Sequence, residues 1–185
     1  MEAFIFRLKA MKLFQIFTIL IRYLLGIAFV WASVFKIFGI RFTPTSGENE
    51  PIYSLAHLLE AMYRSGFYWN FIGWGQMVAG FLIMSQTFST LGAVVYFPIM
   101  LSIFILTTAF GASIFWITTS LMLLANIYLL FWDWNRLKFI IQNKPSSYTD
   151  QTTPFSRQKI WTYVGISLFV AIVFFRMISA RQIIS

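Results

Sequence analysis

Five long apolar runs, separated by polar connections, constrain this chain more than any other feature of its sequence. They extend over about residues 13–38, 68–86, 91–110, 114–134 and 160–178. A helix needs about 20 apolar residues to cross the hydrocarbon core of a bilayer, and each run is close to that length. Only 11% of the residues are charged, whereas about a quarter are charged in typical soluble domains. The sequence therefore predicts an all-α integral membrane protein.

The runs divide the chain into a membrane core and flanking segments. We expect an antiparallel four-helix transmembrane bundle over residues 13–136, preceded by an amphipathic cytoplasmic lead-in at residues 1–12. A basic linker at 137–159 then leads to a fifth transmembrane helix with a short tail at 160–185. The alternative for this last run is that it lies on the membrane surface without crossing.

The longest polar connection, residues 39–67, predicts an interfacial helix on the outer side of the membrane. Pro51 suits the first turn of a helix, and Gly66 can end it. Glu60 precedes Arg64 by four residues, which is the favourable order for an ion pair on one helix face. This charged edge is either simply solvated or part of a lid over the mouth of the bundle.

The distribution of basic residues predicts how the helices are oriented. Nine Lys and Arg residues lie on the side of the amino end, and five lie on the other side. Cytoplasmic segments of membrane proteins are enriched in Lys and Arg, so we expect the amino end in the cytoplasm. The net charge of +8 has the same origin, and it does not indicate nucleic-acid binding.

Composition also excludes several kinds of site. The chain has no cysteine, which excludes disulfides, zinc–thiolate sites and cysteine-ligated iron–sulfur clusters. His57 is the only histidine, and no other ligand residue stands near it at metal-binding spacing, so no metal site is predicted. The sequence shows no self-contained active site, and no catalytic residue is predicted from it.

Three polar side chains within the apolar runs predict a structural network. Arg22 lies in the first run, and Asn126 and Asp133 lie in the fourth. Because these two helices run in opposite directions, Arg22 and Asp133 both approach the inner end, where we expect them to pair. Asn126 lies near mid-span and should bond to a neighbouring helix instead of facing lipid. The alternative for Arg22 is that it extends to one membrane interface while Lys36 extends to the other.

A second set of polar residues predicts a pocket in the outer half of the membrane. It comprises Lys36, Gln76, Glu60 and His57. Ionisable groups inside a membrane are candidates for function. If these residues line one cavity, a quinone carbonyl or an anion could accept hydrogen bonds from Lys36 and Gln76. The alternative is that the polar groups satisfy one another and only orient the bundle.

Small residues predict where the helices approach one another closely. The second run carries Gly73, Gly75 and Gly80, and the first run carries Gly26. Glycine lets the backbones of two membrane helices come into contact, so we expect these positions at helix interfaces. Pro98 removes a backbone hydrogen bond from the third run and should kink that helix.

Six segments taken together resemble the DoxX-like family of bacterial membrane proteins. They are Arg-Tyr-Leu-Leu-Gly-Ile-Ala-Phe at 22–29, Ser-x-x-Lys at 33–36, Gly-Trp-Gly-Gln-Met-Val-Ala-Gly at 73–80, Leu-Gly-Ala at 91–93, Pro-x-Met at 98–100 and Leu-Met-Leu-Leu-Ala-Asn at 121–126. The resemblance covers residues 14–136 and implies a four-helix bundle in the bacterial inner membrane. Members of that family are named for subunits linked to quinol oxidase and thiosulfate:quinone oxidoreductase activity. Two features depart from the pattern: Gln76 stands where the family often has glutamate, and the fifth run lies outside the four-helix core.

The sequence leaves two functions open. The first is a non-catalytic accessory or scaffold subunit of a redox or envelope complex, which would bind a protein partner within the lipid bilayer. The second is a quinone-binding subunit of a membrane oxidoreductase, with quinone as its cofactor. A transporter is the least favoured function because the runs contain few polar residues to line a path.

Overall fold

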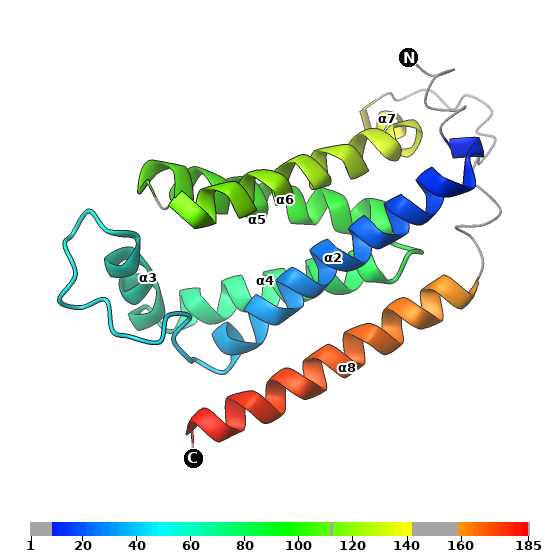
Figure 1. Cartoon of the computed structure of the whole chain (residues 1–185). Helices are drawn as coiled ribbons and strands as arrows, with labels where there is room; N and C mark the ends of the chain where they lie inside the picture. Colours follow the sequence, from blue (N-terminus) through cyan, green and yellow to red (C-terminus); the bar gives the residue numbers. More distant parts are fainter. Residues whose placement is uncertain (1–8, 112, 142–158, 185) are drawn as a thin grey trace.

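The computed structural model describes residues 9–111, 113–141 and 159–184, and all regular structure within these ranges is helical (Figure 1). This confirms the all-α prediction for the described part of the chain. Its helices are α2 (Lys12–Ile37), α3 (Leu55–Arg64), α4 (Phe67–Met84), α5 (Ser89–Ala109), α6 (Ser113–Trp132), α7 (Trp134–Ile141) and α8 (Lys159–Ile184). Most of the predicted lead-in and linker lie outside the described residues, and α7 occupies the start of the predicted linker.

The long helices pack side by side in chain order. α2 packs against α4, α4 against α5, and α5 against α6, while α2 also touches α6 (Figure 1). The short helix α3 lies at one end of this group and α7 lies at the other, and we call these the α3 end and the α7 end. Short turns join α4 to α5 and α5 to α6, so these consecutive helices run in opposite directions.

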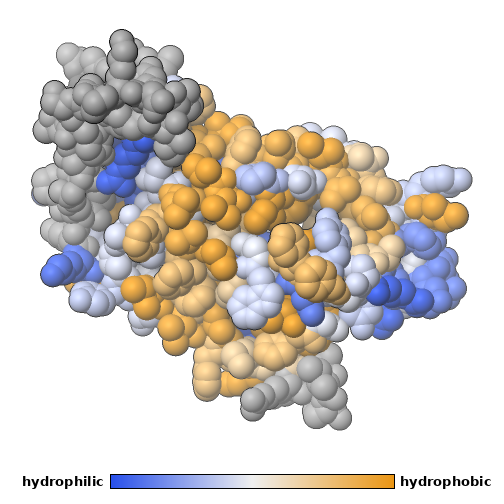
Figure 2. All heavy atoms as spheres, turned by 180° about the vertical axis from the view of Figure 1, so that it is seen from behind, coloured by the Kyte–Doolittle hydropathy of each residue, from blue (hydrophilic) through white to orange (hydrophobic). Residues whose placement is uncertain are grey.

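Four helices are long and apolar enough to cross a membrane. They are α2, α5, the Phe115–Trp132 part of α6 and the Lys159–Ala180 part of α8. The surface agrees with this reading, because hydrophobic residues cover its middle and hydrophilic residues gather toward its ends (Figure 2). α4 is not among the four, since three glycines, Asn70 and Gln76 dilute its apolar residues. The sequence left open whether the C-terminal run crosses the membrane. Its helix α8 is long and apolar enough to cross, whereas the central helix α4 does not reach the same hydropathy.

α8 is held against α2 and α4 by specific contacts. The Tyr23 hydroxyl of α2 donates a hydrogen bond of 2.6 Å to the Trp161 carbonyl oxygen. A Cβ atom added at Gly165 would lie only 1.9 Å from the carbonyl oxygen of Met84, so only glycine allows this close approach. Farther along, Arg176 lies over the ring of Trp31 in α2. From the Tyr23–Trp161 contact to the Trp31–Arg176 contact, the residue number rises along both helices, so α2 and α8 run parallel (Figure 1).

Candidate functional site

Arg22 of α2 is the centre of a buried polar cluster toward the α7 end. Its Nη2 atom donates to Asp133 Oδ2 at 3.1 Å, and its Nη1 atom donates to Gln86 Oε1 at 3.0 Å. The side chains of Arg22 and Asp133 are only 7% and 8% exposed. The structure therefore brings together two of the three residues of the predicted network as an ion pair, at the end of the molecule where the opposed helices should place them.

Asp133 extends this network to further helices. Its Oδ2 atom also accepts a hydrogen bond of 2.9 Å from the Thr90 hydroxyl at the start of α5. The Thr90 hydroxyl in turn accepts one of 3.3 Å from Arg136. The Asp133 carbonyl oxygen accepts from the backbone N–H groups of Arg136 and Leu137, which begins α7. A single residue thus ties α2, α5, α6 and α7 together.

The third predicted member, Asn126, has a hydrogen-bond partner other than Arg22 and Asp133. It is fully buried, and its Nδ2 atom donates to the Ala93 carbonyl oxygen of α5 at 3.3 Å. The same seam between α5 and α6 holds a 2.8 Å hydrogen bond between the hydroxyls of Thr107 and Thr119. The sequence did not predict Gln86 as a partner of Arg22, because Gln86 lies in the turn between α4 and α5, whose path no helical periodicity describes.

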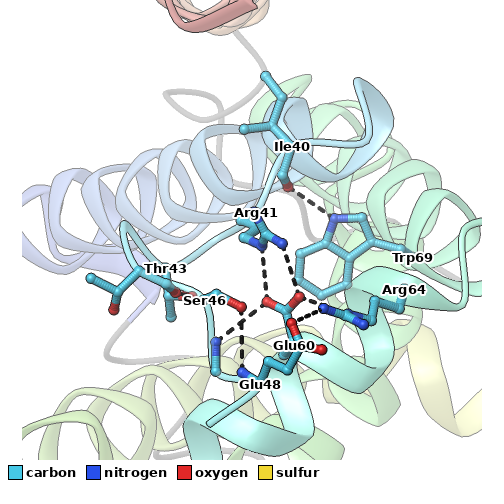
Figure 3. A network of polar contacts seen from close by, with 10 residues as sticks. Ile40, Arg41, Thr43, Ser46, Glu48, Glu60, Arg64 and Trp69 are labelled. Carbon is cyan, nitrogen blue, oxygen red and sulfur yellow. Dashed lines mark hydrogen bonds and ion pairs between the residues drawn. The ribbon is translucent and has the colours of Figure 1, made fainter. Parts of the chain in front are cut away.

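A second polar cluster surrounds Glu60 of α3 at the α3 end. Arg41 donates two hydrogen bonds to the Glu60 carboxylate, from Nε at 2.9 Å and from Nη2 at 3.0 Å. Arg64 donates a third from Nε at 2.9 Å, and the Gly47 backbone N–H donates a fourth at 3.4 Å (Figure 3). Arg64 also pairs with Glu48. The Glu60 side chain is only 4% exposed. Its carboxylate binds Arg41 and Gly47, so it ties the segment before α3 to α3 itself.

Sequence reasoning found only part of the Glu60 cluster. The i,i+4 pair with Arg64 follows from helical spacing and is present. Arg41 lies nineteen residues before Glu60 in an irregular segment, and no periodic pattern connects the two. The helix that carries Glu60 begins as a capped helix, because the Ser54 hydroxyl accepts a hydrogen bond from the His57 backbone N–H.

The arginines around Glu60 make this end of the molecule sensitive to acid. Hydrogen bonds from Arg41 and then Arg64 lower the pKa of Glu60 from 4.5 to about 2. A lowered pKa stabilises the folded state above pH 4.5, and this stabilisation is lost as the pH falls from 4.5 toward 2. We therefore expect amide hydrogen exchange in residues 41–64 to accelerate over that interval relative to exchange in α5.

Glu60→Gln provides the matched control for this prediction. It should give faster exchange in residues 41–64 already at pH 6 and should remove most of the dependence on pH. If the wild-type protein and Glu60→Gln respond identically to acid between pH 4.5 and pH 3, ionisation of Glu60 does not hold the connection.

Lys36, in the last turn of α2, occupies an aromatic setting next to this cluster. Its side chain is buried, with 7% of the residue exposed, and its Nζ donates to the Ala32 carbonyl oxygen at 3.0 Å. The Nζ atom lies 4.8 Å from the ring centroid of Phe42 and 5.2 Å from that of Trp69. The Trp69 indole is itself fixed, since its Nε1 atom donates to the Ile40 carbonyl oxygen at 3.1 Å (Figure 3).

In the described part of the chain, the four residues of the predicted polar pocket are not hydrogen-bonded to one another. Glu60 bonds to its two arginines, and Lys36 bonds to the backbone of its own helix. Gln76 lies one turn beyond Gly73, whose added Cβ would be 2.8 Å from Lys36 Cβ, and its Oε1 is buried without a partner. His57 Nδ1 is also buried without a partner. Within the described ranges, no group of three or more His, Asp or Glu side chains could hold a metal ion.

The predicted packing glycines differ in what they contact. A Cβ added at Gly80 would lie 3.0 Å from the Gly26 carbonyl oxygen, and one added at Gly73 would lie 2.8 Å from Lys36 Cβ. Gly75 has room, because the nearest atom to an added Cβ is Ile99 Cδ1 at 3.6 Å. The contact between α2 and α4 thus depends on glycine at Gly26, Gly73 and Gly80. Pro98 lies inside α5, whose helix continues through it.

Comparisons with known proteins leave the family of the chain unassigned. No family model, no curated protein and no solved structure matches it.

Proposed function

We propose that this chain is a DoxX-like integral membrane protein and serves as a non-catalytic accessory or scaffold subunit of a membrane complex. The observation that carries the proposal is how the charged side chains within the helices are used. Arg22 is paired with Asp133, and Glu60 is paired with Arg41 and Arg64, so these ionised groups tie helices and loops together. Arginine–carboxylate pairs of this kind fix the orientation of the segments that they join, which favours a structural role for these groups.

The topology we propose has five crossings in the bacterial inner membrane. Since α2 and α8 run parallel and are 26 residues each, both are about 39 Å long and can cross in the same direction. The α7 end would then face the cytoplasm, in accord with the distribution of Lys and Arg. α3 would lie at the outer interface, where the exposed side chains of Ile52, Tyr53 and Phe67 can enter the headgroup region.

Affinity purification in a mild detergent tests the accessory role. We expect the tagged full chain to recover a membrane protein partner at a fixed ratio that survives size-exclusion chromatography. The control is a multi-pass protein of similar size with the same tag, expressed in the same cells. Recovery of the chain alone, in a detergent that keeps other membrane complexes of those cells intact, would rule out a stable subunit role.

Lys36 favours a second candidate, a quinone-binding subunit. Its ammonium group has three donors, one of which bonds to the Ala32 carbonyl oxygen, and the described residues supply no second acceptor; it lies over the rings of Phe42 and Trp69. A quinone has a flat ring that can stack on aromatic side chains and a carbonyl oxygen that can accept from Nζ. The neighbouring Gln76 amide offers a further polar group in the same half of the membrane.

Quinone binding can be measured directly on the purified chain. We expect a short-chain ubiquinone analogue to quench tryptophan fluorescence, and Lys36→Met to weaken the binding by about tenfold or more. A hydrogen bond to a charged group contributes about 1.5–3 kcal/mol, and about 1.4 kcal/mol corresponds to a factor of ten. Lys12→Met removes an exposed lysine from the other end of α2 and should leave the affinity unchanged. Equal affinities for all three proteins would exclude Lys36 as a quinone ligand.

A further inference from the structure

Arg176 of α8 is a buried cation at the seam between α2 and α8. Only 7% of the residue is exposed. Its guanidinium carbon lies 3.9 Å from the ring centroid of Trp31 and 3.7 Å from that of Phe35. These two rings are four residues apart and therefore share one face of α2. The guanidinium of α8 is thus packed against two aromatic rings of α2.

The bonding of Arg176 differs from that of the other buried arginine. Arg22 has a carboxylate and an amide oxygen as acceptors. Over the described ranges, the structure gives Arg176 no hydrogen bond and no ion pair, and its Nε atom is buried without a partner. Aromatic rings compensate part of the positive charge, but they do not satisfy five N–H donors. The described residues therefore leave N–H donors of Arg176 without a hydrogen-bond acceptor.

The surroundings of Arg176 indicate what kind of molecule supplies this acceptor. The Trp31 ring that contacts the guanidinium is exposed and apolar, and so are Phe175, which stacks on Trp31, and Ile178, two residues after Arg176 on α8. Along α2, Trp31 and Phe35 lie only about 9 and 3 Å before the last residue, Ile37, at 1.5 Å per residue. A group that accepts hydrogen bonds from Arg176 therefore has to reach the guanidinium near the end of α2. It would lie beside exposed apolar side chains that hydrocarbon chains can cover.

We propose that Arg176, Trp31 and Phe35 form the headgroup site of an anionic phospholipid in the seam between α2 and α8. Arginine binds phosphate oxygens through two parallel N–H groups, which matches the donors left unpaired here. Basic pockets between membrane helices hold lipid headgroups by the same chemistry. The acyl chains would follow the exposed side chains of Trp31, Phe175 and Ile178. This site depends on α8 lying in the membrane and does not depend on either proposed function.

Thermal unfolding of the full chain in a nonionic detergent tests the site. Phosphatidylglycerol should raise Tm by about 2–4 °C more than phosphatidylcholine does. Arg176→Gln should lose this additional rise. Lys159→Gln, which removes an exposed charge from the other end of the same helix, should keep it. Equal effects of the two lipids on the wild-type protein, or an undiminished additional rise in Arg176→Gln, would overturn the proposal.

A second measurement needs no substitution at Arg176. The fluorescence that is lost in Trp31→Phe isolates the signal of Trp31, which contacts the guanidinium. Brominated phosphatidylglycerol should quench this signal more strongly than brominated phosphatidylcholine at the same mole fraction. Equal quenching would overturn the lipid site even if Arg176→Gln fails to fold. If inorganic phosphate alone gives the full rise in Tm, the site binds a soluble anion and the lipid assignment is wrong.

Discussion

Replacing Asp133 with leucine should lower the free energy of unfolding by about 3–5 kcal/mol, because Arg22 would keep a buried positive charge without its counter-charge. The change should appear in equilibrium unfolding of the purified chain in mixed detergent micelles. The loss should be large because Asp133 also accepts from Thr90 and therefore links α2 to α5.

Two further variants separate the charge from the contacts. The double variant Arg22→Met with Asp133→Leu should recover much of the lost stability, since it leaves no unpaired charge. Exchanging the two residues, Arg22→Asp with Asp133→Arg, should also be more stable than either single change. Thr90→Val removes one hydrogen bond to the same carboxylate and should cost only about 1 kcal/mol. If Asp133→Leu is no more destabilising than Thr90→Val, the ion pair does not hold the helices together.

Substituting leucine for Gly80 should cost about 3 kcal/mol and push α2 away from α4. A Cβ atom at this position would lie 2.8 Å from Val30 Cγ2 and 3.0 Å from the Gly26 carbonyl oxygen, and the backbone oxygen cannot move aside without shifting the helix. Overpacking of this kind typically costs about 1–3 kcal/mol. The same unfolding assay measures the loss, and cross-linking of cysteines introduced on α2 and α4 measures the separation. The chain has no native cysteine to compete.

Gly75 provides the control on the same helix. An added Cβ would meet nothing closer than Ile99 Cδ1 at 3.6 Å, so Gly75→Ala fits without a clash. Alanine is also a better helix former than glycine by about 1 kcal/mol, so stability should stay the same or rise. A Gly80→Leu protein that unfolds like Gly75→Ala would show that α2 and α4 are not in backbone contact.

The parts of the fold that were predicted from sequence follow from length and direction. An apolar run of about 20 residues specifies a long helix in any packing. Successive helices that run from one end of the bundle to the other alternate in direction, so α2 and α6 are opposed and Arg22 and Asp133 lie toward the same end. The pair of Glu60 with Arg64 likewise depends only on the geometry of a single helix.

The parts that were not predicted depend on which faces meet. Gly75 and Gly80 have the same sequence signature, yet only Gly80 faces α2. Arg41 reaches Glu60 through an irregular loop, whose path no periodicity describes. Nothing in the sequence predicted that Arg176 would lie against Trp31 and Phe35, because these contacts exist only once α8 has docked parallel to α2. In each case, the deciding information is tertiary packing.

The parallel docking of α8 has a consequence for how the protein is assembled. Parallel helices cannot form as a hairpin, and Tyr23 lies 138 positions before its acceptor Trp161. α2 leaves the ribosome before α8, so α8 does not yet cover the α2 face that carries Trp31 and Phe35 while the intervening helices are made. Membrane helices associate after insertion, so this flank can close only once α8 has been inserted. A nascent chain that stops before α8 would leave that flank open to a helix from another protein.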